Sequence, residues 1–170
     1  MYRITRQIAI DAAHRLMTHG GKCRGMHGHR YNIEVICETE NLYTSGEEAG
    51  MGKDFSFLKN LMLETIDAYC DHGLIAAADD RELLEMFCPE GEKSSWADVI
   101  SRIASIHGYA FFPKARLSTK LYVVSFTPTA ENLAYHWFER LKPLIEGQSE
   151  IRLACVKVWE TPNCIAEYWA

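Results

Sequence analysis

Alternation of apolar and polar residues near both ends of the chain constrains the fold more than any other feature. Within residues 2–10, and again within 29–38, apolar side chains fall on one parity and mostly polar side chains on the other. A period of two residues indicates a β-strand with one buried face. Further strand-like runs are 120–126, 151–160 and 165–169. We therefore predict strands grouped at both ends of the chain, the first two of them paired antiparallel.

The stretches between these strands carry apolar residues at helical spacing. The expected helices cover 54–70, 79–87, 95–107 and 128–142. Asp54 suits the N-cap of the first helix, and Gly73 can serve as its C-terminal breaker. Pro128 opens the last helix, and Pro143 is expected to end it. Because regular βαβ alternation is lacking, the pattern favours an α+β domain in which helices pack on one face of an antiparallel β-sheet.

Length and charge narrow the classes of partner. The 170 residues suffice for one domain with a proper core, and 48% hydrophobic against 24% charged residues is ordinary for a globular protein. A net charge of −5 gives no general attraction to nucleic acid or to a membrane surface.

With neither a signal sequence nor a membrane span in the pattern, we expect a cytoplasmic protein. The six cysteines contain no CxxC pair, so we expect most of them to be reduced core thiols.

Three histidines form the most informative cluster. His27 and His29 are two residues apart at the start of a predicted strand, so both imidazoles project from one face. His14 ends the preceding strand, and antiparallel pairing would place it beside them. Three nitrogen ligands with an open position are typical of catalytic zinc, whereas structural zinc is normally enclosed by four ligands rich in cysteine. The alternative, ordinary histidines in a glycine-rich loop, is the better interpretation for any one of them but not for all three.

A few other residues carry acid–base or binding groups. Cys23, four positions before His27, could be a fourth and closing metal ligand, a nearby acid or base, or a core thiol. Asp71 and His72 follow a predicted helix, where a carboxylate can orient an imidazole as a proton donor, although a dipeptide alone is weak evidence. Glu160 ends a mostly apolar strand and is either a surface carboxylate or a hydrogen-bond acceptor for a bound heterocycle.

Six short motifs are informative as an ordered set. They are Ala12-Ala13-His14, Cys23-x-x-x-His27-Gly28-His29, Lys53-Asp54-Phe55, Asp71-His72, Pro128-Thr129-Ala130-Glu131-Asn132 and Trp159-Glu160-Thr161. Together they resemble the 6-pyruvoyl/6-carboxy-tetrahydropterin synthase family. The resemblance implies the family's tunnelling fold (T-fold) and a zinc ion as cofactor.

The same resemblance implies a role for each chemically capable residue. The implied residues are, for zinc, His14, His27 and His29; for proton transfer, the general base Cys23 and the donor pair Asp71 and His72; and for the pterin ring, Glu160, with Thr129 and Glu131 at positions near that pocket. The implied partners are a small pterin triphosphate substrate and further copies of the chain. These copies would form a trimer, or a hexamer of two stacked trimers. In such a homo-oligomer, Asp71 and His72 would reach the zinc of a neighbouring subunit, so active sites would lie at subunit interfaces.

The spacing of three residues between Cys23 and His27 resembles the bacterial 6-carboxy-tetrahydropterin synthases of queuosine biosynthesis. The expected activity is therefore that of a zinc-dependent carbon–carbon lyase that converts 7,8-dihydroneopterin triphosphate into 6-carboxy-5,6,7,8-tetrahydropterin, with release of acetaldehyde and triphosphate. Three alternatives stay open: triphosphate elimination of the 6-pyruvoyl-tetrahydropterin synthase type, a non-catalytic zinc-binding module closed by Cys23, and a zinc hydrolase that needs neither Asp71 nor His72.

The sequence departs from the family pattern at two places. The stretch between His72 and Pro128 is long for a family member, and we expect 88–118 to be an insertion within the single domain 1–170. This insertion would form a surface element, a lid or part of a subunit contact. In addition, Cys70 stands where many members have leucine before Asp-His, and Gly73-Leu74-Ile75 follows the pair.

Overall fold

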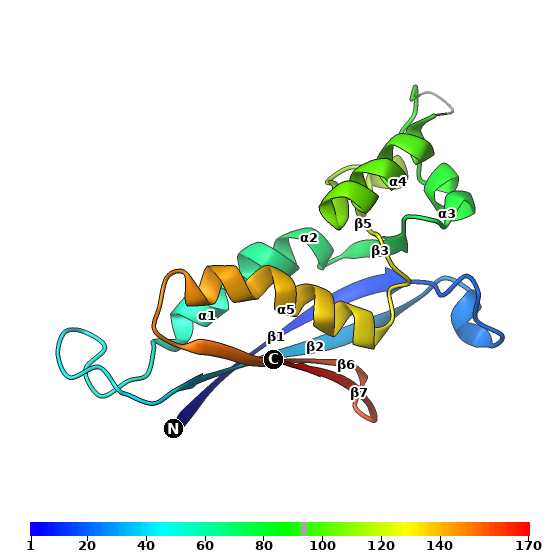
Figure 1. The fold of residues 1–170 in the computed structure, drawn as a ribbon. Coiled ribbons are helices and arrows are strands. Elements are labelled where there is room, and N and C mark those ends of the chain that lie inside the picture. Colours follow the sequence, from blue (N-terminus) through cyan, green and yellow to red (C-terminus); the bar gives the residue numbers. More distant parts are fainter. Residues whose placement is uncertain (93–94) are drawn as a thin grey trace.

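A computed structural model describes residues 1–92 and 95–170 and is built around a mixed seven-stranded sheet (Figure 1). The strands, in sheet order, are β4 (Tyr109–Phe112), β5 (Lys120–Val124), β3 (Gly73–Ala77), β1 (Tyr2–His14), β2 (His27–Thr39), β6 (Arg152–Thr161) and β7 (Cys164–Trp169). The predicted antiparallel pairing of the first two strands is confirmed, and it runs from Tyr2 opposite Thr39 to His14 opposite His27. Both strands are longer than the alternation alone indicated.

The expectation of an antiparallel sheet is wrong at one end, because β3 pairs in parallel with both β1 and β5. β3 and β4 are also the strands that the sequence pattern missed. Residues 74–78 are all buried, so the run has no polar alternation to reveal it. The four residues of β4 are too few to establish a period.

The four expected helices are present, together with two short helical turns that the sequence did not indicate. They are η1 (Lys22–Arg24), α1 (Phe55–Met62), η2 (Leu63–Asp67), α2 (Ala68–Cys70), α3 (Arg81–Met86), α4 (Trp96–His107), η3 (Arg116–Ser118) and α5 (Ala130–Glu146). Asp54 caps α1 as predicted, with its carboxylate accepting a hydrogen bond of 2.6 Å from Ser56 N. In the described part of the chain, no helix has the length and apolar character needed to cross a membrane.

Two of the predicted helix ends are wrong. Pro143 lies inside α5, which continues to Glu146; the buried Leu141 and Ile145 hold this last turn against the core, although Pro143 cannot donate a backbone hydrogen bond. Gly73 does not end the earlier helix but begins β3, and the residue with left-handed backbone is His72, at φ 53°. Glycine is needed at 73 for space, since a Cβ there would lie 3.1 Å from the carbonyl oxygens of Cys70 and Lys120.

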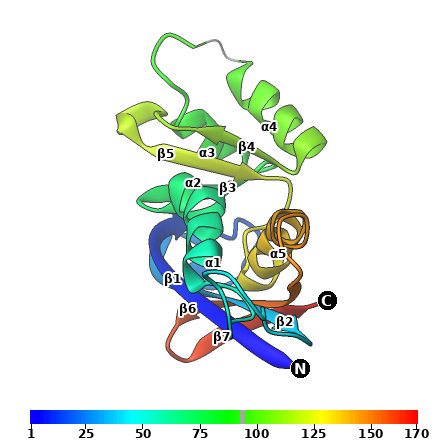
Figure 2. The ribbon, with the colours of Figure 1, turned by 90° about the vertical axis from the view of Figure 1, so that its left-hand side faces the viewer.

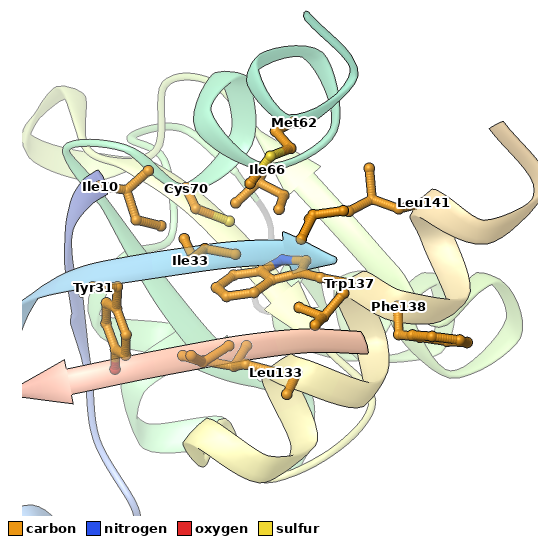
Figure 3. Packing of buried hydrophobic residues seen from close by; sticks show 14 of the residues in the cluster. Ile10, Tyr31, Ile33, Met62, Ile66, Cys70, Leu133, Trp137, Phe138 and Leu141 are labelled. Carbon is orange, nitrogen blue, oxygen red and sulfur yellow. The ribbon is translucent and has the colours of Figure 1, made fainter. Parts of the chain in front are cut away.

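Helices cover both faces of the sheet, which corrects the expectation of one covered face. Trp137, Leu141 and their neighbours on α5 pack with α1 and η2 over β1 and β2 (Figure 3). On β3, Ile75 joins this cluster, whereas Leu74 and Ala76 belong to a second cluster with α3 and α4. Because neighbouring residues of a strand point to opposite faces, α3 and α4 cover the other face at the β3–β5–β4 end (Figure 2).

A buried polar network joins α5 to the sheet. Arg140 donates to the hydroxyl of Tyr122 at 2.8 Å and to Thr65 O at 2.9 Å, and the Tyr122 hydroxyl lies 2.7 Å from His136 Nε2. Since a guanidinium only donates, the Tyr122 oxygen accepts from Arg140 and its proton points to His136. His136 is therefore neutral, and burial, together with the charge of Arg140, lowers its pKa from 6.5 to about 4.

This network predicts a loss of stability in acid. The folded protein resists protonation of His136, whereas the unfolded chain accepts a proton near pH 6.5, so stability is retained above that pH and lost as pH falls toward 4. The expected contribution is up to about 3 kcal/mol. Urea titrations between pH 8 and pH 4 measure it. His136→Gln should flatten the decline relative to the natural chain, and equal slopes for the two proteins would refute the assignment.

Candidate metal and catalytic site

His14, His27 and His29 meet at one end of the β1–β2 ribbon. His14 is the last residue of β1 and lies opposite His27, the first residue of β2, while His29 lies opposite Ala12. Because residues two apart in a strand share a face, all three imidazoles project to the same side. Their ligand atoms lie within 4.8 Å of one another. The predicted convergence of the three histidines is confirmed.

Backbone carbonyls fix the orientation of two of these rings. His14 Nδ1 is 2.8 Å from Pro128 O, and His27 Nδ1 is 2.8 Å from Gly25 O. A carbonyl only accepts, so each Nδ1 carries a proton and Nε2 is the ring nitrogen left to coordinate a metal. His14 Nε2 is buried and has no hydrogen-bond partner among the described residues. Nε2 of His14 and Nε2 of His27 are therefore the ring nitrogens available to bind a cation.

The electrostatics of the group also suit a metal ion. Burial lowers the pKa of His14 from 6.5 to about 4, and the neighbouring His27 and His29 add to this effect, although the Pro128 carbonyl opposes it. The ring is consequently neutral near pH 7 and able to coordinate. Imidazole nitrogens are ligands for zinc and for other first-row transition metals, so this donor set fits a metal without choosing the ion.

Glu160 lies at the edge of the histidine group. Its Oε1 is 3.9 Å from His14 Nε2, and its side chain is 25% exposed. The register between β6 and β7 shifts between Trp159 and Thr161, which places Glu160 in a bulge. A bulge changes the direction in which a side chain projects, compared with its direction in regular strand pairing. The carboxylate thus lies near His14 and remains partly exposed to solvent.

Cys23 lies in η1, within the loop that joins β1 to β2. Its carbonyl accepts a hydrogen bond of 2.8 Å from Leu16 N, which closes the loop, and its thiol is free and half-buried. Among the described residues, the set of ligand atoms within 4.8 Å of one another contains the three histidines and not Cys23. Cys23 therefore lies outside the set of converging ligand atoms.

Asp71 and His72 form an oriented pair at the start of β3. Asp71 Oδ2 lies 2.8 Å from His72 Nδ1, and Asp71 Oδ1 accepts a hydrogen bond of 2.9 Å from Asp11 N. Burial raises the pKa of Asp71, but these two hydrogen bonds and the positive charge of Lys120 outweigh it and lower the pKa below its ordinary value. The carboxylate is therefore ionised near pH 7 and able to orient the imidazole.

The imidazole of the pair is exposed and makes no hydrogen bond or ion pair with the histidine group among the described residues. The His72 side chain is 78% exposed. No hydrogen bond or ion pair joins Asp71 or His72 to the three histidines among the residues that the structure describes. The sequence indicated these two residues correctly as a pair, and the fold leaves their imidazole available to another molecule.

Thr129 and Glu131 begin α5. Thr129 is the N-cap, with its hydroxyl accepting a hydrogen bond of 3.3 Å from Asn132 N, and Glu131 is exposed. The residue before this cap is Pro128, whose carbonyl accepts a hydrogen bond from His14. The sequence does not indicate the roles of the Pro128 and Gly25 carbonyls, because every residue has a carbonyl group and only the fold directs these two at the histidine rings. Tyr31, two residues after His29 in β2, lies on the same face of the strand, and its ring contacts that of His29.

Solved structures that superpose on this chain define the class of its fold. The chain superposes on a crystal structure of an uncharacterized protein from Wolinella succinogenes, with TM-score 0.70, 22% identity, and coverage of 99% of this chain and 97% of that one. It also superposes on the 6-pyruvoyl tetrahydropterin synthase of Caenorhabditis elegans, with TM-score 0.59, 23% identity, and coverage of 99% and 95%. The fold is therefore that of the tetrahydropterin synthases, which confirms the predicted T-fold.

Sequence comparison supports the same assignment over the full length. The family model described as 6-pyruvoyl tetrahydropterin synthase matches residues 3–170. This chain belongs to that family. A relative from Rickettsia bellii is 30% identical over 98% of this chain and 99% of its own length, and one from Haemophilus influenzae is 31% identical over 99% of each. Both relatives are named 6-carboxy-5,6,7,8-tetrahydropterin synthase.

Proposed function

We propose that this protein is a zinc-dependent lyase of queuosine biosynthesis. With water, it converts 7,8-dihydroneopterin triphosphate into 6-carboxy-5,6,7,8-tetrahydropterin, acetaldehyde and triphosphate. The observation that carries the proposal is the group of three histidines, oriented by backbone carbonyls, in a chain similar over its full length to proteins named for this product. The composition and the pathway favour a cytoplasmic location.

His14, His27 and His29 would hold the zinc ion. When bound there, zinc supplies a Lewis acid that stabilises negative charge developing on the oxygens of the substrate side chain. The three histidine ligands are neutral, so they leave this positive charge undiminished. The carbonyls of Pro128 and Gly25 hold two of the rings in place.

Proton transfer falls to residues on two sides of the substrate. Cys23 acts as the general base, because its thiol is free, half-buried and close in sequence to His27 without belonging to the metal-binding set. His72 acts as the acid: Asp71 orients its ring, and the exposed imidazole can approach a bound molecule. Removal and return of protons of this kind require an acid and a base and no redox cofactor.

Glu160 is proposed to anchor the pterin ring by accepting hydrogen bonds from its N–H groups. Its position at a bulge beside His14 brings the ring to the metal. Thr129 and Glu131 belong to the same family motif, and we propose that they line the pocket from the start of α5. Thr129 caps α5 directly after Pro128, whose carbonyl contacts His14.

The active chain is proposed to be a homo-oligomer, a trimer or a hexamer, with active sites at subunit interfaces. β4 and β7 form the two edges of the sheet and leave unpaired backbone groups that association can cover. The exposed His72 would then act at the metal site of a neighbouring subunit. We propose that 88–118, which includes α4 and β4, is an insertion relative to shorter family members and contributes to this assembly.

The shared site predicts that two inactive variants restore each other. Cys23→Ala lacks the base and His72→Ala lacks the acid, so an oligomer that contains both variants has some sites with neither defect. Subunits mixed through mild urea and then returned to buffer should recover up to about a quarter of natural activity, since random pairing leaves that fraction of interfaces intact. Each variant treated alone is the control. No recovery after subunit exchange verified by mass spectrometry would mean that each chain carries a complete site.

Product analysis tests the proposed reaction. Zinc-loaded protein is incubated with 7,8-dihydroneopterin triphosphate, and the products are separated and identified by mass spectrometry. We expect 6-carboxytetrahydropterin together with acetaldehyde. Accumulation of 6-pyruvoyltetrahydropterin would establish the pyruvoyl-forming reaction instead, and unchanged substrate in the presence of bound zinc would indicate a binding module.

A further inference from the structure

Tyr31 carries a buried hydroxyl that the fold itself does not use. The residue is 0% exposed, and its hydroxyl has no hydrogen-bond partner among the described residues. An unpaired buried hydroxyl destabilises a folded protein relative to phenylalanine, which has the same shape. The described residues offer this oxygen no hydrogen-bond partner, and a ligand bound in the neighbouring site can supply one.

The surroundings of Tyr31 identify which ligand this is. The Tyr31 ring lies edge-on to His14 and His29, with centroid distances of 5.8 and 5.5 Å. The pairing of Asn32 with Trp159 brings Tyr31 beside Glu160 on the neighbouring strand. In the apolar cluster, Tyr31 lies at the side away from Leu141 (Figure 3).

The unpaired atoms elsewhere in the described chain differ in kind. Besides Tyr31 and His14, the buried side-chain nitrogens or oxygens without partners belong to Arg6, Trp96 and Trp137. The indole N–H groups of Trp96 and Trp137 accompany large rings that fill the two apolar clusters. At position 31, phenylalanine would fill the same space without the polar atom. Tyr31 and His14 are, moreover, neighbours in one site.

We infer that the Tyr31 hydroxyl forms a hydrogen bond with the bound pterin substrate, between Glu160 and the metal-binding histidines. This inference rests on the proposed function and adds a substrate-binding residue to it. The contact orients the substrate and holds it equally in the ground state and in the transition state. It therefore acts on substrate affinity and leaves the metal site and the proton-transferring groups unchanged.

The experiment compares Tyr31→Phe with the matched variant Tyr122→Phe. Both tyrosines are 0% exposed, but the Tyr122 hydroxyl is paired with Arg140 and His136. Zinc content, the urea midpoint of the metal-free protein, kcat and KM for 7,8-dihydroneopterin triphosphate are measured for both variants and for the natural protein. Tyr31→Phe should keep or raise the urea midpoint, keep full zinc content, and raise KM about 5- to 10-fold with kcat within about 2-fold. Tyr122→Phe should lower the midpoint and leave KM unchanged.

Two results would overturn the inference while the proposed function stands. One is an unchanged KM for Tyr31→Phe with natural activity in the parent protein. The other is a loss of zinc from Tyr31→Phe, which would make the hydroxyl part of the metal site. If the natural, zinc-loaded protein does not consume the pterin triphosphate, the proposed function fails, and the inference fails with it.

Discussion

Replacing His27 with alanine is expected to empty the metal site and to lower turnover by more than about 1000-fold. Only three described residues converge there, and His27 contributes one ligand nitrogen of the set. Loss of an outer partner of a metal ligand already costs 10- to 100-fold in affinity, and loss of the ligand itself should cost more. Zinc content after gel filtration and steady-state turnover measure the two effects. His27 is partly exposed at the start of β2, so the fold should survive the change.

His107→Ala is the matched control, because this histidine is exposed at the end of α4 and belongs to the second apolar cluster's helix. The control should retain one zinc ion per chain and natural turnover. If His27→Ala instead kept a full complement of zinc and its activity, the three-histidine site would be wrong, whatever the similarity of the chain to its relatives.

Cys23→Ala should separate metal binding from catalysis. A general base that is not a ligand can be removed without emptying the site, so we expect full zinc content and an unchanged unfolding midpoint. Turnover should fall by about 100- to 10,000-fold, the usual contribution of a positioned acid or base. Metal analysis and product formation on the same preparation provide both readouts.

Cys88→Ala supplies the comparison for this variant. Cys88 is also a free, partly exposed thiol, but it follows α3 and belongs to neither the histidine group nor the loop that carries Cys23. It should keep both zinc and turnover. A drop in zinc content for Cys23→Ala alone would show that the thiol closes the coordination, as in a non-catalytic zinc module.

The parts of the fold that followed from the sequence are those in which one face is buried. β1, β2 and α5 each have one buried and one exposed face, and their apolar and polar residues alternate accordingly along the sequence. β3 is buried on both faces, so its sequence shows no alternation of apolar and polar residues. This strand nevertheless makes the sheet mixed and positions Asp71 beside β1. The continuation of α5 past Pro143 likewise depends on core packing that no local signal contains.

Some residues of the site could likewise be predicted from the sequence, whereas others depend on contacts that only the fold creates. His27 and His29 were predictable because a strand places alternate residues together, and His14 because antiparallel pairing brings strand ends together. The bulge at Glu160 depends on the register with β7 and could not be read from the chain. The exposed direction of His72 follows from its left-handed backbone and from the hydrogen bond of its N–H to Asp11 O.

The most direct test of the central claim is X-ray absorption spectroscopy at the zinc edge of the zinc-loaded resting protein. An open three-histidine site beside a free thiol predicts nitrogen and oxygen scatterers alone, at about 2.0–2.1 Å, with the imidazole multiple-scattering pattern. Cys23→Ala should give the same spectrum. A sulfur shell near 2.3 Å in the natural protein that disappears in Cys23→Ala would contradict the account, because Cys23 would then be a ligand and not the base.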